Sequence, residues 1–156
     1  MTPDLLALVA QYRAGLEAEL ALLRRLEELA SRQRDASHRG DLEGLALVTD
    51  ERDQVMASVV TIEHEIKPIR LTLLEQWQDL HGSPEFRELA TLHRVAAALV
   101  STIVASDQDS LEALKEAELA RRFAARTLEQ GETTLAAYRK VVAPPLAGAS
   151  IVDRKG

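Results

Sequence analysis

Residues 5–36 read LLALVAQYRAGLEAELALLRRLEELASRQRDA, and this stretch decides the fold class. Its apolar residues recur in steps of three and four, at Leu5, Val9, Tyr12, Leu16, Leu20, Leu23, Leu26 and Ala30. This spacing lines one face of an amphipathic α-helix. Thr2 and Asp4 supply a cap and early negative charge, and Gly40 follows basic residues at the far end. The sequence therefore predicts a helix over residues 4–37.

A second apolar stripe of the same spacing begins directly after this helix. Asp41 can cap its start, and its apolar positions continue to Leu80. Because Gly40 and Asp41 leave room for only a tight turn, we expect the first two helices to be antiparallel neighbours. Pro68 lies inside the second stripe, where a proline costs about 3 kcal/mol and either kinks or ends a helix. The stripe keeps its phase across Pro68, which favours a kinked helix over residues 41–80.

Clear helix-ending and helix-starting residues separate the second stripe from a third. Residues 81–85, HGSPE, combine a glycine terminator, a serine cap and a proline suited to a first helical turn. The third stripe runs from Phe86 to Val142 and is interrupted by the polar residues 106–110. Because this interruption contains neither Gly nor Pro, the sequence favours one continuous helix, with a turn as the alternative. The pattern ends before a pair of prolines, and residues 143–156 are predicted to form a flexible tail.

Composition narrows the fold class. The 156 residues are 46% hydrophobic and 3% aromatic, with seven Gly and no Cys. So few turn residues exclude an all-β fold, and the lack of Cys excludes disulfides and thiolate metal sites. We predict an all-α fold, an antiparallel bundle of three long helices with coiled-coil-like packing, or four if residues 106–110 turn. The bundle is expected to form one domain over residues 1–142, followed by the flexible tail.

Several classes of function lack a sequence signal. The net charge is -6 and the sequence shows no basic face, so we expect no nucleic-acid binding. It also shows no signal peptide and no run of about 20 apolar residues, so we expect a cytoplasmic chain with no membrane insertion. Asp35 and His38 are the single pair at a metal-binding spacing, and no second pair accompanies them. Nucleophile-elbow and phosphate-binding glycine motifs are missing from the sequence. The sequence therefore predicts no catalytic residues, no metal and no cofactor.

Individual residues leave alternatives open. His64 lies between two glutamates and is expected on a solvated helix face, whereas His93 is expected to be partly buried. Trp77 is interpreted as a heptad core position, with an exposed anchor for a partner as the alternative.

The late apolar residues also admit two interpretations. They are either the last turns of the core or a surface on which an amphipathic helix of another chain docks. The candidate partner-binding residues are Leu128, Leu135, Tyr138, Val141 and Val142, with Ile151 and Val152 in the tail.

Three stretches carry a family resemblance. They are residues 5–36, residues 40–66 (GDLEGLALVTDERDQVMASVVTIEHEI) and the polar interruption at 105–117 (ASDQDSLEALKEA). The placement of the segment from Tyr138 to the last glycine is also similar. On these residues the chain resembles the FlgN-type flagellar export chaperones, which are small, acidic, cytoplasmic helical proteins.

The resemblance implies a function and partners. It implies a chaperone that binds the helical C-terminal segments of hook-filament junction proteins and delivers them to the type III export gate. It also implies that substrate contacts lie on the last helix, and that Tyr138 contacts the export gate component. Leu128, Leu135 and Val142 accompany Tyr138 by helical spacing. The alternative is a structural coiled-coil adaptor or homodimeric scaffold, in which self-association covers every apolar stripe.

Overall fold

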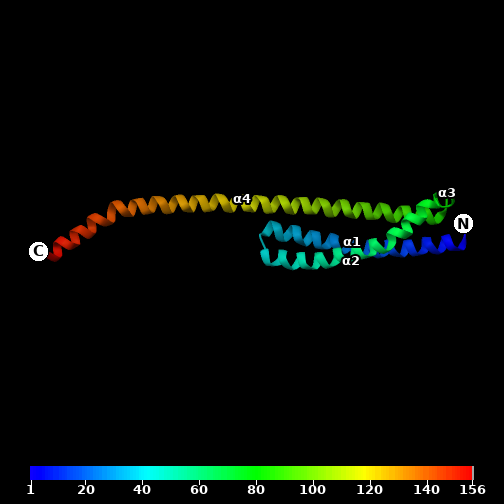
Figure 1. The fold of residues 1–156 in the computed structure, drawn as a ribbon. Helices are drawn as coiled ribbons and strands as arrows, with labels where there is room; N and C mark the ends of the chain where they lie inside the picture. The colour runs from blue at the N-terminus through cyan, green and yellow to red at the C-terminus, as the bar shows by residue number, and fades with distance from the viewer. Residues whose placement is uncertain (156) are drawn as a thin grey trace. The chain divides into compact units, whose positions relative to one another are not determined.

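The computed structural model describes the backbone of residues 1–155 and the side chains of residues 1–141. Its helices are α1 (Pro3–Arg39), α2 (Leu42–Glu75), α3 (Trp77–Leu80) and α4 (Pro84–Lys155), as Figure 1 shows. Residues 1–155 contain no strand, and the long helices pack on one another, so the prediction of an all-α bundle is confirmed. The chain divides into two compact units, Met1–Leu114 and Lys115–Gly156.

The first two helices form an antiparallel hairpin, as predicted (Figure 1). The hydroxyl of Thr2 accepts a hydrogen bond from the backbone N–H of Leu5 at 3.2 Å, which caps the start of α1. Gly40 ends α1 with φ 66°, a left-handed conformation that costs glycine little. Asp41 then caps α2, because its carboxylate accepts a hydrogen bond from the N–H of Gly44 at 2.9 Å.

Helix α2 continues through Pro68 but ends before the position predicted from the sequence. The backbone leaves helical geometry at Gln76, with φ -96° and ψ 21°, so Trp77–Leu80 form a separate short helix and not the last turn of a helix over 41–80. The N–H of Gln76 bonds to the carbonyl oxygens of Thr72 and Leu73, which closes α2. This break lets the Trp77 ring meet Phe86 edge to face, with 4.9 Å between ring centroids.

Helix α4 is continuous across the polar residues 106–110, as the sequence favoured. Ser106 and Ser110 are buried, and the Ser110 hydroxyl donates to the Ser106 carbonyl oxygen at 3.0 Å. Asp107 accepts two hydrogen bonds of 2.6 Å from the guanidinium of Arg52. Because these polar groups bond within the helix or to α2, the segment has no need to leave helical geometry.

The core lies within the unit Met1–Leu114. One buried cluster joins α1 with the second half of α2, α3 and the start of α4: Leu5, Val9, Tyr12, Leu16, Ile66, Leu73, Leu80 and Leu89. A second buried cluster lies nearer the α1–α2 turn: Leu26, Ala30 and Ile103. Polar bonds from Arg13 to Glu88 and from His38 to Asp109 show that this part of α4 runs parallel to α1.

The first of the two compact units ends at Leu114. One domain over residues 1–142 stays a prediction. Helix α4 itself runs to Lys155, beyond the end of the apolar stripe at Val142. The flexibility of residues 143–156 stays a prediction.

Candidate functional site

The large apolar side chains of residues 115–141 are exposed. Six of them, which we call the distal face, are between 63% and 74% exposed: Leu119, Phe123, Leu128, Leu135, Tyr138 and Val141. Successive residues of an α-helix are about 100° apart, so these six fall within one half of the helix circumference. Such a continuous exposed apolar face is typical of a surface that binds another protein.

Charged residues occupy the opposite half of the same segment. Arg121 and Arg122 both pair with Glu118, the latter pair at 3.2 Å. By helical spacing, Glu118 and Arg122 lie on the side away from the distal face, and Arg121 lies at its edge beside Leu128. Intrahelical pairs of this kind stabilise a helix by a few tenths of a kcal/mol. Residues 115–141 therefore combine one apolar and one charged side, which is the pattern of a helix that docks by one face.

Small residues form the centre of the distal face. The heptad positions that are buried at Leu89 and Ile103 continue in register through Ala117, Ala120, Ala124, Thr127, Gly131 and Thr134. Larger side chains, such as Phe123 and Leu128, flank this row by one position. Because small side chains let two backbones approach closely, another helix can pack against this row.

Four of the predicted partner-binding residues lie on the distal face: Leu128, Leu135, Tyr138 and Val141. None of them joins a buried cluster of the described side chains. The other three, Val142, Ile151 and Val152, lie outside the residues whose side chains the structure describes. Sequence reasoning missed Leu119 and Phe123, although their spacing of four residues was a signal for one helix face.

A polar network ties α1, α2 and α4 together inside the unit Met1–Leu114. The Tyr12 hydroxyl accepts a hydrogen bond from Nε of Arg70 at 2.8 Å and lies 3.0 Å from Nε2 of His93. Burial lowers the pKa of His93, which favours a neutral ring whose Nε2 can accept a hydrogen bond from the Tyr12 hydroxyl. The other guanidinium nitrogens of Arg70 donate to both carboxylate oxygens of Glu63, at 2.6 and 2.8 Å.

The network also shifts the pKa values of two neighbouring carboxylates in opposite directions. Burial, together with the neighbouring Glu63, raises the pKa of Glu19 to about 7. The hydrogen bonds from Arg70 lower the pKa of Glu63 to about 2. Burial raises the pKa of Tyr12, so its hydroxyl stays protonated at neutral pH. Each of these groups interacts with another member of the network. We therefore interpret the network as a structural connection between helices.

Trp77 lies at the rim of a small hollow of about 150 Å³. Its side chain is 42% exposed, so the interpretation as a buried heptad position is wrong. The cause is the break at Gln76, which takes Trp77 out of the register of α2. The ring stacks on His81 and contacts Phe86, and the hollow beside it is lined mainly by apolar side chains of α2, α3 and α4.

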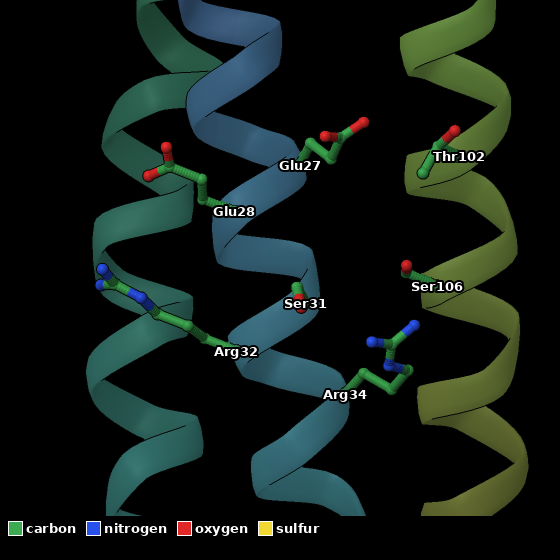
Figure 2. Close-up of a pocket in the computed structure, with 7 residues that line it drawn as sticks. All are labelled: Glu27, Glu28, Ser31, Arg32, Arg34, Thr102 and Ser106. Carbon is green, nitrogen blue, oxygen red and sulfur yellow. The ribbon is translucent and has the colours of Figure 1, made fainter.

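A larger hollow of about 530 Å³ lies between α1 and α4. In Figure 2, Glu27 and Arg34 extend from α1 toward the side of Thr102 and Ser106, while Glu28 and Arg32 point toward α2. The lining therefore mixes two acidic and two basic side chains with hydroxyls. These groups do not converge on one point, so the hollow suggests neither a catalytic centre nor a charged ligand.

Among the described residues, no three His, Asp or Glu side chains gather where they could hold a metal ion. Over Pro84–Val141, α4 is long and apolar enough to cross a membrane by length and composition alone, a property that core helices of soluble proteins share. No protein-family model, no curated protein and no solved structure matches this chain.

Proposed function

We propose that this protein is a cytoplasmic export chaperone of the FlgN type. It binds the helical C-terminal segments of hook-filament junction proteins and delivers them to the flagellar type III export apparatus. The observation that carries the proposal is the distal face, an apolar half-circumference of α4 over residues 119–141 whose large side chains are exposed. The assignment to flagellar substrates rests on the sequence resemblance.

Helix capture needs an apolar face of sufficient length, and the distal face supplies it. Residues 119–141 span about 33 Å at about 1.5 Å per residue, which accommodates some six turns of a bound helix. The bound helix would place large apolar residues against the small central row, with Phe123 and Leu128 at its edges. Recognition of this kind reads side chains spaced by three, four and seven residues and consumes no nucleotide.

A capture site must also be kept from binding unfolded chains indiscriminately. Arg121 and Arg126 border the distal face and favour partners whose flanking side chains are acidic or polar, and Gln130 adds an amide within the face. The chain as a whole is acidic, with a net charge of -6, which helps to keep a loaded complex in solution.

The proposal is tested with peptides that correspond to the C-terminal helices of hook-filament junction proteins, labelled for fluorescence anisotropy. We expect the full chain to bind such a peptide and the Leu135→Glu variant to bind at least tenfold more weakly, because a charge in an apolar contact costs more than about 1.4 kcal/mol. Ala136→Glu is the matched control, since it places the same residue one position away on the charged side of the helix. It should bind like the unmodified protein.

Truncation after Thr127 sharpens the test. This shortened chain keeps the unit Met1–Leu114, so its circular dichroism should still show folded helices while peptide binding is lost. Full-strength binding by the truncated chain, or equal loss in the Leu135→Glu and Ala136→Glu variants, would contradict the proposal. A chain that self-associates but binds none of the peptides would favour the structural adaptor instead.

A further inference from the structure

We propose that a second copy of this chain docks on the distal half of α4, so that two α4 helices pack antiparallel with their residue numbers summing to about 228. Residues 115–141 of each copy then cover residues 87–113 of the other. The inference goes beyond the proposed chaperone function and does not depend on it, although a substrate helix and a second copy would compete for the distal half. It rests on an exposed face in each unit and on the way the two faces match.

The receiving face lies on α4 within the unit Met1–Leu114. Val100, Val104 and Leu111 are 45%, 48% and 55% exposed, although they belong to a helix whose other side packs in the core. Their separations of four and seven residues place them on one side of α4. Three exposed aliphatic side chains in a row form an apolar strip, and no segment of the described chain buries it.

The sequence of α4 is self-complementary about Leu114. Residues at intervals of seven, which lie along one side of a coiled-coil helix, are Val100, Asp107, Leu114, Arg121 and Leu128. In an antiparallel pair centred on Leu114, Val100 meets Leu128 of the second copy, and Asp107 meets Arg121. Leu114 meets its own counterpart.

The neighbouring positions match in size as well as in charge. In the same register the large residues Val104 and Leu111 meet the small residues Ala124 and Ala117 of the second copy, and Ala97 meets Gly131. Pairing large with small side chains across an interface lets the helices interdigitate. Because the match holds in both directions, one contact surface serves both copies, as a two-fold symmetric dimer requires.

The net charges of the two segments also favour a second copy as the partner of the distal half. Residues 1–114 hold 11 basic and 20 acidic residues, a net charge of -9, whereas residues 115–156 hold 8 basic and 5 acidic residues, a net charge of +3. Attraction between the basic segment of one copy and the acidic unit of another speeds association and selects their orientation. Asp107 already accepts two bonds from Arg52, but its side chain is 33% exposed and a carboxylate has further lone pairs for Arg121.

Cysteine cross-linking tests the pairing directly, because the chain has no cysteine of its own. The variants Val100→Cys and Leu128→Cys are prepared separately, mixed, and oxidised with glutathione. We expect a disulfide-linked dimer in the mixture and almost none from either variant alone. In the antiparallel pair, the two copies of either cysteine are 28 residues apart along the helix, about 42 Å, far beyond the reach of a disulfide.

A matched control and a second measurement complete the test. Replacing Leu128→Cys by Ala136→Cys, on the charged side of α4, should reduce the cross-linked fraction of the mixture at least fivefold. Light scattering of the unmodified chain should show a mass that rises from one copy toward two with concentration, and 1 M salt should weaken this rise. A constant monomer mass, or efficient cross-linking within either single variant, would overturn the antiparallel dimer. Peptide binding by the chaperone test is measured separately and has no part in these outcomes.

Discussion

The two halves of α4 share one helix and one heptad spacing, but they differ in what their apolar positions hold. In residues 84–114 these positions include Leu89, Leu92 and Ile103, which lie in or beside the core. In residues 115–134 they hold Ala, Thr and Gly, and the large side chains of Leu119, Phe123 and Leu128 lie one position beside them, where they are exposed. The period is therefore equal in both halves, and the size of the side chains distinguishes a core helix from a docking helix.

This difference matters because burial is what converts an apolar side chain into stability. A fully buried leucine contributes roughly 1.5–3 kcal/mol relative to an exposed one, whereas alanine, threonine and glycine contribute far less. The first half of α4 is stabilised by its contacts within the unit Met1–Leu114. The second half depends on helix propensity and intrahelical pairs until another helix covers it.

The largest expected effect comes from a leucine in the bundle. Leu29 is 0% exposed, so Leu29→Ala should lower the free energy of unfolding by about 2–5 kcal/mol through lost burial and a cavity. Leu119→Ala is the matched substitution on the distal face, where 63% exposure predicts a change within about 0.5 kcal/mol. Urea unfolding at low protein concentration measures both. Equal losses would show that the distal half is buried in solution.

A smaller loss is expected where a polar pair joins α2 to α4. Arg52 donates to both carboxylate oxygens of Asp107 and also to Gln33, at 2.8 Å. Arg52→Met should cost about 1–3 kcal/mol, because it leaves a partly buried carboxylate without its donor. The double variant Arg52→Met with Asp107→Leu should recover part of that loss, since neither polar partner then remains. If the double variant unfolds more easily than the single one, the pair does not act in this way.

The helices were predictable from sequence because their apolar positions repeat over many turns and their ends carry caps. The hairpin turn at Gly40 and the continuity across 106–110 followed from this local chemistry. The break at Gln76 did not, because no glycine or proline marks it and the Trp77–Phe86 contact that accompanies it joins separate helices. The exposure of the distal face could not be settled either, since the same stripe fits a buried and an uncovered helix. Leu119 and Phe123 were missed because the apolar stripe can be traced through Ala117, Ala120 and Ala124 at this point, which are also apolar and spaced by three and four residues.

Replacing glycine by alanine is expected to have opposite effects on stability at Gly15 and at Gly131. A Cβ at Gly15 would collide with the Ile66 side chain, so Gly15→Ala should destabilise the bundle by about 1–3 kcal/mol. A Cβ at Gly131 meets no atom within 4 Å, and alanine favours a helix interior by about 0.5–1 kcal/mol. Gly131→Ala should therefore raise the helical signal in circular dichroism without lowering the thermal midpoint. A destabilising Gly131→Ala would mean that a close contact exists at this position.

The smallest expected effect is a pH dependence of stability, and we expect it for Glu19 in the unit Met1–Leu114 but not for Glu118 in the other unit. The folded state raises the pKa of Glu19 to about 7 from 4.5, so it binds this proton more tightly than the unfolded chain. Linkage then requires stability to fall as pH rises from about 4.5 to above 7, because the folded state must hold a charged Glu19 beside Glu63. Gln cannot ionise, so Glu19→Gln should raise the thermal midpoint at pH 8 and leave it unchanged at pH 5.

Glu118 on the charged side of α4 provides the contrast. Arg121 lowers the pKa of Glu118, so the stability that this charge contributes is present above pH 4.5 and is lost as pH falls. The pair is solvated, and screening by salt leaves little of that contribution to measure. Glu118→Gln should therefore shift the midpoint at neither pH 5 nor pH 8 in 0.15 M salt. A shift at pH 8 as large as that of Glu19→Gln would mean that Glu118 is desolvated in solution. Such desolvation would indicate that a second helix covers the charged side of α4 and not the distal face.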